Sequence, residues 1–292
     1  MSHPLWIVDA FTDRAFAGNP AAVCVLDAPA PADWMQNVAR EMNLSETAFL
    51  HQESARAYRL RWFTPAIEVE LCGHATLASA HVLWSEGMLA PDAPARFATK
   101  SGELSAVRAG GSVELDFPAK LARPAPTPEG LAEALGAEPL ITRRDGDDYL
   151  VELESEHVVR DLRPDIAALV DLPLRGVIVT APADRAAGNA KDLPRQTDDA
   201  DPGRLVPVPT PPAPTYDFVS RFFAPGYGVA EDPVTGLAHC YLGPYWAPRL
   251  GRTDLLGYQA SARGGYVDVA VRGERVGLGG RAVTVLRGEL LA

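Results

Sequence analysis

The chain has 292 residues, of which 47% are hydrophobic and 22% charged, so it is long enough to bury a sizeable core without disulfides or metals. Its formal net charge of -11 argues against a nucleic-acid partner, because the phosphate backbone would be repelled. With three cysteines, no signal-peptide pattern and no apolar window of about 18 residues, the sequence predicts a cytoplasmic protein that does not enter a membrane.

The first half of the chain alternates predicted strands with two helices. Apolar runs bounded by turn residues predict strands at 6–11, 21–27, 47–52, 58–64, 97–108 and 112–119. Apolar residues at helical spacing predict a helix over 31–44, and a strongly apolar second helix follows the glycine turn that opens 71–89. The Pro- and Ala-rich stretch 120–127 then indicates a domain boundary.

The second half repeats this order of elements. A short helix is expected over 128–137, a longer apolar helix runs through Tyr245 and Trp246, and strands are expected at 147–155, 176–181, 216–225, 265–272 and 281–288. Residues 182–215 are rich in proline, charge and small side chains and lack periodicity. This composition indicates a surface insertion, with a lid over a site as the alternative.

An internal repeat predicts two lobes. Residues 61–65 read RWFTP and residues 221–225 read RFFAP, and the same offset of 160 residues carries Cys72 onto Asp232. Further along, an offset of 163 residues carries three positions onto identical ones: Gly102, Val113 and Leu115 onto Gly265, Val276 and Leu278. A duplicated fold explains these matches, and its pseudo-twofold axis would make corresponding loops face one another across a cleft.

Both repeated loops lead into apolar helices, at 75–84 and 237–246. A helix N-terminus carries unpaired backbone N–H groups and a partial positive charge. Two such ends meeting in a cleft would bind a carboxylate, and an acidic side chain beside them would be placed to take a proton from the bound acid's carbon skeleton.

Four residues near these helix starts are candidates for acid–base chemistry, each with a plainer alternative. Glu46 is either a solvated turn residue or a general base partly removed from water. His74 is either a cap or core residue or a proton donor, with a neutral imidazole because a helix N-terminus disfavours the cation. Asp232 is either a helix N-cap or a cleft acid, and Cys72 is either an acid–base thiol or a small buried one.

A metal site is the less favoured alternative. The cysteines and histidines at these loops, namely Cys72, His74, His81, His239 and Cys240, form only a loose set. None of the usual ligand spacings joins them, and no glycine-rich strand-to-helix turn indicates a dinucleotide site. The sequence therefore predicts neither a metal nor a cofactor.

Four blocks of sequence resemble the PhzF family of phenazine biosynthesis-like isomerases: VDAFTDRAFAGNPAAV (8–23), NLSETAFL (43–50), FTPAIEVELCGHATLASA (63–80) and SRFFAPGYGVAEDPVTGLAHCYLGPYW (220–246). The resemblance covers nearly the whole chain except 182–215. It implies an α+β fold similar to diaminopimelate epimerase and proline racemase, with two pseudo-symmetric lobes, each a mixed sheet or barrel wrapped around a central apolar helix. The N-terminal lobe would be 1–118 with the last strand, about 284–292, and the C-terminal lobe 119–283.

The resemblance also implies a function and its residues. The family's model reaction isomerises trans-2,3-dihydro-3-hydroxyanthranilate by a proton shift, and its members usually form homodimers and use no cofactor or metal. The family's catalytic glutamate matches Glu46 in SETAF, its histidine matches His74 in GHAT, and its aspartate matches Asp232 in EDPVTG. We therefore expect a cofactor-independent isomerase or epimerase that moves a proton on a small carboxylic acid.

Substrate contacts follow from the same resemblance, with one departure from it. Backbone N–H groups near Gly73, His74 and Gly236 would hold the substrate carboxylate, and Asn19 would line the pocket. Many relatives have a small polar residue after the EDPVTG glycine, whereas this chain has Leu237, which removes a hydroxyl contact and makes the pocket more apolar.

Two other functions fit the sequence less well. A non-catalytic small-molecule-binding or interaction protein on the same fold would not need all three acid–base residues. An amino-acid racemase with two thiols would need a cysteine at both symmetric positions, whereas only Cys72 is present.

Overall fold

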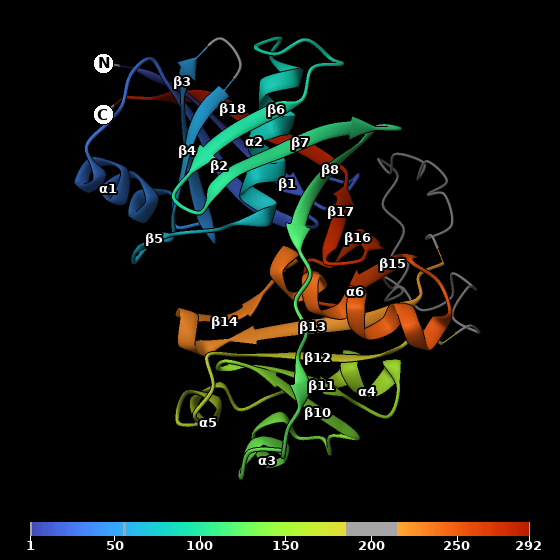
Figure 1. Ribbon diagram of the computed structural model, residues 1–292. Helices are drawn as coiled ribbons and strands as arrows, with labels where there is room; N and C mark the ends of the chain where they lie inside the picture. Colours follow the sequence, from blue (N-terminus) through green and yellow to red (C-terminus); the bar gives the residue numbers. More distant parts are fainter. Residues whose placement is uncertain (1, 55–56, 185–214, 292) are drawn as a thin grey trace, which may run out of the picture.

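Two lobes of similar construction stand one above the other in the computed structural model, which describes residues 2–54, 57–184 and 215–291 (Figure 1). The N-terminal lobe contains strands β1 to β8 together with the last strand, β18, and the C-terminal lobe contains β9 to β17. The insertion expected over 182–215 lies, apart from its ends, outside the described residues. No helix within the described ranges is long and apolar enough to cross a bilayer.

The N-terminal lobe is a sheet around a buried helix. Its strands are β1 (His3–Ala10), β2 (Asn19–Leu26), β3 (Glu46–Ser54), β4 (Ala57–Phe63), β5 (Glu68–Val69), β6 (Ala95–Thr99), β7 (Gly102–Ala109), β8 (Ser112–Pro118) and β18 (Ala282–Leu290). Helix α1 (Ala32–Met42) lies between β2 and β3 in the chain, and α2 (Gly73–Ser85) lies between β5 and β6.

The C-terminal lobe is built in the same way. Its strands are β9 (Arg123–Pro124), β10 (Ile141–Asp145), β11 (Asp148–Glu152), β12 (Gly176–Pro182), β13 (Phe218–Ala224), β14 (Val229–Asp232), β15 (Asp254–Gln259), β16 (Gly265–Arg272) and β17 (Arg275–Gly280). Its helices are α3 (Leu131–Leu135), α4 (Glu156–Asp161), α5 (Ile166–Val170) and α6 (Gly236–Leu250), with a short 3₁₀ helix, η1, at Pro225–Tyr227.

Strand order and direction are the same in the two lobes. The N-terminal order is β18-β1-β2-β3-β4-β6-β7-β8, with β2–β3 and β4–β6 parallel and the other neighbours antiparallel. The C-terminal order is β9-β10-β11-β12-β13-β15-β16-β17, with β11–β12 and β13–β15 parallel and the rest antiparallel. The duplication predicted from the repeat is therefore present in the topology.

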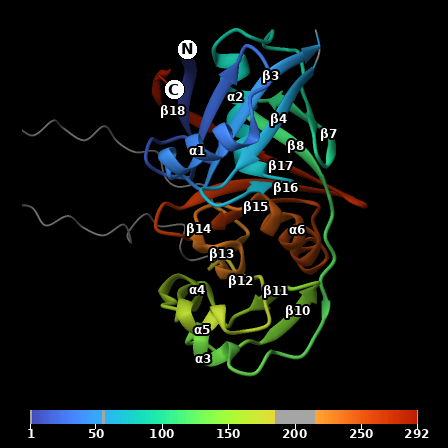
Figure 2. The ribbon, with the colours of Figure 1, turned by 90° about the vertical axis from the view of Figure 1, so that its left-hand side faces the viewer.

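The lobes join through β8 and β17, which pair antiparallel with Leu115 opposite Leu278. These two leucines are repeat equivalents, so the pseudo-twofold axis passes between them. The chain then crosses between lobes, descending from β8 along one side of the molecule to β10 and returning from β17 into β18 (Figure 2).

Helices α2 and α6 are each wrapped by one sheet. Ten residues of each helix are buried. A helix that is apolar on all sides has no solvent face to keep in water, so it is stable only inside a core. Leu77 and Leu83 of α2 share one hydrophobic cluster with Leu242 and Trp246 of α6, so a single core runs through both lobes and fixes the helices relative to one another.

Two details differ from the sequence expectations. The run 97–108 is two strands, β6 and β7, separated by a two-residue turn at 100–101. The helix equivalence is also shifted, because α2 begins at Gly73 after the N-cap Cys72, and α6 begins at Gly236 after the N-cap Thr235. The counterpart of Cys72 is therefore Thr235 and not Asp232, since β14 has four residues where β5 has two.

Candidate active site

The predicted site residues come from the ends of four elements at the junction of the lobes. Asn19 is the first residue of β2, and Glu46 is the first residue of β3. The parallel register of these strands brings Ala21 opposite Glu46, so both strand starts lie at the same edge. His74 is the second residue of α2, and Asp232 is the last residue of β14. The structure therefore brings together residues from both lobes.

A chain of polar contacts links the four side chains. Glu46 Oε2 lies 3.2 Å from His74 Nε2, an ion-pair distance that lacks the alignment of a hydrogen bond. On the other side of the ring, His74 Nδ1 lies 3.2 Å from Asn19 Nδ2. Asn19 Nδ2 in turn donates to Asp232 Oδ1 at 2.9 Å and to the Val234 carbonyl at 2.9 Å. The Asn19 side chain thus connects the histidine of one lobe to the aspartate of the other.

The Asn19 amide has fewer hydrogens than acceptors around it. Its NH2 group has two hydrogens, whereas His74 Nδ1, Asp232 Oδ1 and the Val234 carbonyl are all within reach. When His74 carries both ring protons, Asn19 keeps its bonds to Asp232 and Val234, and His74 Nδ1 faces Cys72 Sγ at 3.5 Å. The contacts therefore accommodate a cationic His74.

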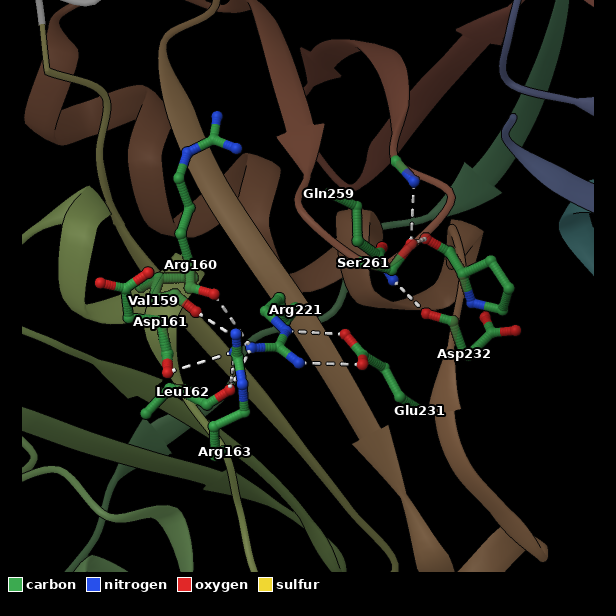
Figure 3. A network of polar contacts seen from close by, with 12 residues as sticks. Val159, Arg160, Asp161, Leu162, Arg163, Arg221, Glu231, Asp232, Gln259 and Ser261 are labelled. Carbon is green, nitrogen blue, oxygen red and sulfur yellow. Dashed lines mark hydrogen bonds and ion pairs between the residues drawn. The ribbon is translucent and has the colours of Figure 1, made fainter. Parts of the chain in front are cut away.

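The aspartate is held by its own set of partners. The Thr235 hydroxyl donates to Asp232 Oδ2, and Gln259 Nε2 donates to the Asp232 backbone carbonyl at 2.7 Å. Gln259 Oε1 accepts from the Thr235 backbone N–H at 2.9 Å. Figure 3 shows Gln259 and Ser261 on one side of Asp232. Asp232 is consequently not the helix N-cap, a position that Thr235 occupies.

The pKa values of these groups are shifted. Burial raises the pKa of Asp232 to about 6, and Glu46 adds to this, while His74 and the bonds from Thr235 and Asn19 oppose it. For His74, burial lowers the pKa, but Cys72 and Glu46 raise it, and the balance lies well above the usual value. The expected neutral imidazole was therefore wrong, because a carboxylate 3.2 Å away outweighs the helix N-terminus.

The two helix starts approach each other closely. A Cβ atom added to either Gly73 or Gly236 would lie 3.4 Å from the Cα of the other. Neither N-cap side chain, Cys72 or Thr235, makes a capping hydrogen bond. The positive ends of two helices therefore meet beside the acid–base chain, as predicted, and this arrangement suits an anion. Leu237, the counterpart of His74, is half-buried against the main core.

The metal alternative finds little support in the geometry. Among the described residues, Glu46, Cys72 and His74 form the one cluster whose ligand atoms lie within 4.8 Å of one another. The His74 ring stands between the other two, presenting Nδ1 to Cys72 and Nε2 to Glu46, so one ion cannot use the contacts that these groups make. His81 instead contacts Thr284, and His239 contacts the Thr235 carbonyl.

Sequence reasoning missed two residues that support the site, Gln259 and Thr235. Gln259 is fully buried at the end of β15, and it contacts both Asp232 and Thr235. A glutamine between an apolar strand and a glycine turn is a weak signal in a single sequence. Thr235 in EDPVTG was visible as turn chemistry, but its bond to Asp232 depends on the fold around it.

The fold defines a class of two-lobed isomerase-like proteins. Hydroxyproline epimerase from Agrobacterium vitis has the same fold with a TM-score of 0.57 and 15% identity, over 99% of this chain and 91% of that one. At this identity the likeness concerns the fold alone. The diaminopimelate epimerase-like architecture expected from the sequence is thus confirmed.

The chain belongs to the PhzC-PhzF family of phenazine biosynthesis-like proteins, whose family model matches residues 8–288. A protein named as an uncharacterized isomerase in Halalkalibacterium halodurans is 47% identical over 292 residues, covering 100% of this chain and 99% of the relative. The crystal structure of a PhzF-family phenazine biosynthesis protein from Enterococcus faecalis matches with a TM-score of 0.86 and 40% identity, over 100% of both chains. The predicted family is thus confirmed.

Proposed function

We propose that the protein is a cofactor-independent isomerase or epimerase that transfers a proton on a small carboxylic acid. The observation that carries this proposal is the polar chain from Glu46 through His74 and Asn19 to Asp232, beside two meeting helix starts. The proposal includes a homodimer in the cytoplasm, as the family resemblance implies.

In the proposed reaction, the substrate carboxylate lies at the starts of α2 and α6, near Gly73 and Gly236. Glu46 takes a proton from the carbon next to the carboxylate, or from a position conjugated to it, and the electron pair of that C–H bond moves toward the carboxylate. The helix N-termini stabilise the negative charge that develops there. The proton then returns to a different carbon, or to the other face of the same carbon.

His74 and Asp232 would support this transfer in different ways. A cationic His74 beside Glu46 holds the base in place and can supply a proton. Asp232, with a pKa near 6, is present in both protonation states close to neutral pH and can therefore accept or donate. A thiol base fits less well, because burial raises the pKa of Cys72 to about 11 and its counterpart is Thr235.

The test is deuterium incorporation from D2O, followed by NMR. The panel contains trans-2,3-dihydro-3-hydroxyanthranilate and small amino and hydroxy acids, because Leu237 makes the substrate of this chain uncertain to transfer from the family. One compound is expected to exchange with the wild type, and Glu46→Gln should lower that rate about 10²- to 10⁴-fold.

Glu41→Gln is the matched control, since Glu41 is an exposed carboxylate on the neighbouring helix α1. It should exchange like the wild type. Undiminished exchange with Glu46→Gln would reject Glu46 as the base. Ligand-induced thermal stabilisation without exchange for any compound would favour a binding protein on this fold.

A further inference from the structure

The turn between β15 and β16, residues 260–264, contacts both chain segments that carry the polar site. On the C-terminal side, Ser261 Oγ donates to the Pro233 carbonyl at 2.8 Å, directly after Asp232 (Figure 3). Gln259, just before the turn, donates to the Asp232 carbonyl. The turn therefore supports the Asp232 segment from its own lobe.

The same turn reaches across to the other lobe through Arg263. Its Nε donates to the Gly18 carbonyl at 2.8 Å, and one terminal nitrogen donates to the Ala17 carbonyl at 3.0 Å and to Asp9 Oδ1 at 2.7 Å. The Gly18 N–H donates to the Gly264 carbonyl at 2.7 Å. Gly18 immediately precedes Asn19, so these bonds fix the backbone that carries the central amide of the site.

Asp9 makes this contact an interior one. Its side chain is only 2% exposed, whereas that of Arg263 is 31% exposed. The second carboxylate oxygen, Oδ2, accepts from the Phe16 backbone N–H at 2.7 Å. Asp9 therefore holds the 11–18 segment from one end, and Arg263 holds the Asp9 carboxylate. An acid buried in this way needs its partner, because an uncompensated interior charge is costly.

The 11–18 segment has a backbone that it would not adopt without support. Phe11 has φ 62° and Phe16 has φ 68°, in a region that is unusual for bulky residues. Gly18 has φ 65°, and a Cβ at this position would lie 2.1 Å from the Ala10 carbonyl oxygen. Such conformations persist when surrounding contacts determine them, and they concentrate at functional sites.

We infer that Arg263 is a positioning residue, which fixes the Asn19 amide between His74 and Asp232 by holding the 11–18 segment through Asp9, Ala17 and Gly18. Arg263 acts through Asn19 and touches no reacting atom. The consequence for catalysis rests on the proposed function, whereas the consequence for Asp232 does not. Without Arg263, the segment relaxes, Asn19 loses its bond to Asp232, and the pKa of that carboxyl rises further.

The experiment measures the pKa of Asp232 by carboxyl ¹³C NMR in the wild type, Arg263→Gln, Arg263→Lys and Asp9→Asn. Arg263→Gln should raise it, and Arg263→Lys should raise it less, because lysine keeps a donor for Asp9 but cannot serve three acceptors. Asp9→Asn should also raise it, since the segment loses its anchor. A simple charge effect would instead move Arg263→Gln and Asp9→Asn in opposite directions.

The matched control is Arg281→Gln. Arg281 reaches the same segment through Asp13 at 3.4 Å, but both side chains are well exposed. It should leave the Asp232 pKa unchanged. In the exchange assay, Arg263→Gln should lose up to about 100-fold in rate, as a misplaced group does, and Arg281→Gln should lose nothing.

An unchanged Asp232 pKa in folded Arg263→Gln and Arg263→Lys would overturn the inference, as would opposite shifts in Arg263→Gln and Asp9→Asn. If no compound in the panel exchanges, the proposed function fails, but the pKa comparison still decides the role of Arg263. The two failures are therefore separable.

Discussion

The first residue of β3 is Glu46, and the first residue of its counterpart in the other lobe, β12, is Gly176. The second residue of α2 is His74, and that of α6 is Leu237. In the other direction, β14 ends at Asp232 and β5 ends at Val69. Each proposed acid–base residue therefore faces an apolar or small residue at the equivalent position of the other lobe.

What both lobes keep is the backbone feature that needs two copies. Gly73 and Gly236 occupy equivalent positions, and they approach so closely that a side chain on either would press on the other. A binding site made of two helix ends needs both ends, whereas a proton transfer between different groups needs only one copy of each. The comparison teaches that the duplication preserved the anion site and divided the acid–base roles.

The largest effect should come from removing the roles that the lobes do not share. Glu46→Gln and Asp232→Asn should each lower the exchange rate about 10²- to 10⁴-fold, and the double variant should be little worse than the poorer single one, because groups that act as a unit are not additive. Exchange rates of the three variants in D2O provide the measurement.

Val69→Ala, at the counterpart of Asp232, is the control and should exchange at close to the wild-type rate. Additive losses in the double variant would mean that the two carboxyls act independently, and the division of roles across one polar chain would be wrong.

A second comparison concerns an ion pair that occurs in both lobes. Arg61 binds Glu68 through two bonds of 2.7 and 2.9 Å, and Arg221 binds Glu231 with the same two distances. The Arg221 side chain is 9% exposed and that of Arg61 is 24% exposed. Arg221 also donates to backbone carbonyls at the end of α4, including Leu162 at 2.9 Å (Figure 3).

Arg221→Met should therefore cost about 3–5 kcal/mol in the free energy of unfolding, because it leaves Glu231 and the α4 carbonyls without their partner. Arg61→Met should cost about 1 kcal/mol or less, since its pair is closer to solvent. Urea denaturation of both variants checks this. Equal losses would show that the additional carbonyl contacts of Arg221 contribute nothing to stability.

The repeated RWFTP and RFFAP segments show how far the sequence could lead. They predicted the equivalent strands β4 and β13, and with them the duplicated fold. They did not predict that β14 is longer than β5, so the fixed offset of 160 residues paired Asp232 with Cys72. Strand ends depend on hydrogen bonds to neighbouring strands, which a repeat in sequence does not contain.

The candidate site was predictable in its residues but not in its contacts. Glu46, His74, Asp232 and Asn19 were named from motifs and lie together, yet the direction of the His74 pKa depends on the placement of Glu46. The bond between Asp9 and Arg263 joins residues at opposite ends of the chain, and nothing local to either one indicates its partner.

A third prediction contrasts the acidic residues of β5 and β14 by pH. The folded-state pKa of Asp232 is raised from 3.8 to about 6, so its contribution to stability is present below pH 4 and is lost as pH rises to about 6. The loss reaches about 3 kcal/mol, at 1.36 kcal/mol per pKa unit. The pKa of Glu68 is lowered, chiefly by its hydrogen bond from Arg61, so its contribution is present above pH 4.5 and is lost on acidification.

Unfolding free energies of the wild type, Asp232→Asn and Glu68→Gln across pH 4 to 7 measure this contrast. Asp232→Asn should gain on the wild type as pH rises, and Glu68→Gln should gain as pH falls. Parallel curves for the wild type and Asp232→Asn would remove the shifted pKa of Asp232 from the argument.

The smallest expected effect separates the two turns that support the helix starts. Ser101 Oγ donates to the Glu70 carbonyl at 2.7 Å, and Ser261 Oγ donates to the Pro233 carbonyl at 2.8 Å, each two residues before a helix N-cap. Ser101→Ala and Ser261→Ala should each cost about 1 kcal/mol or less in stability, the worth of one hydrogen bond. Only Ser261 supports a proposed acid–base residue, so Ser261→Ala should also slow exchange, by about fivefold for the same 1 kcal/mol, while Ser101→Ala should leave it unchanged. The β15–β16 turn has five residues and the β6–β7 turn has two, and the longer one carries Arg263 to the other lobe. Equal slowing by both variants would mean that the two turns support the site alike, and that the longer turn does not account for the difference between the lobes.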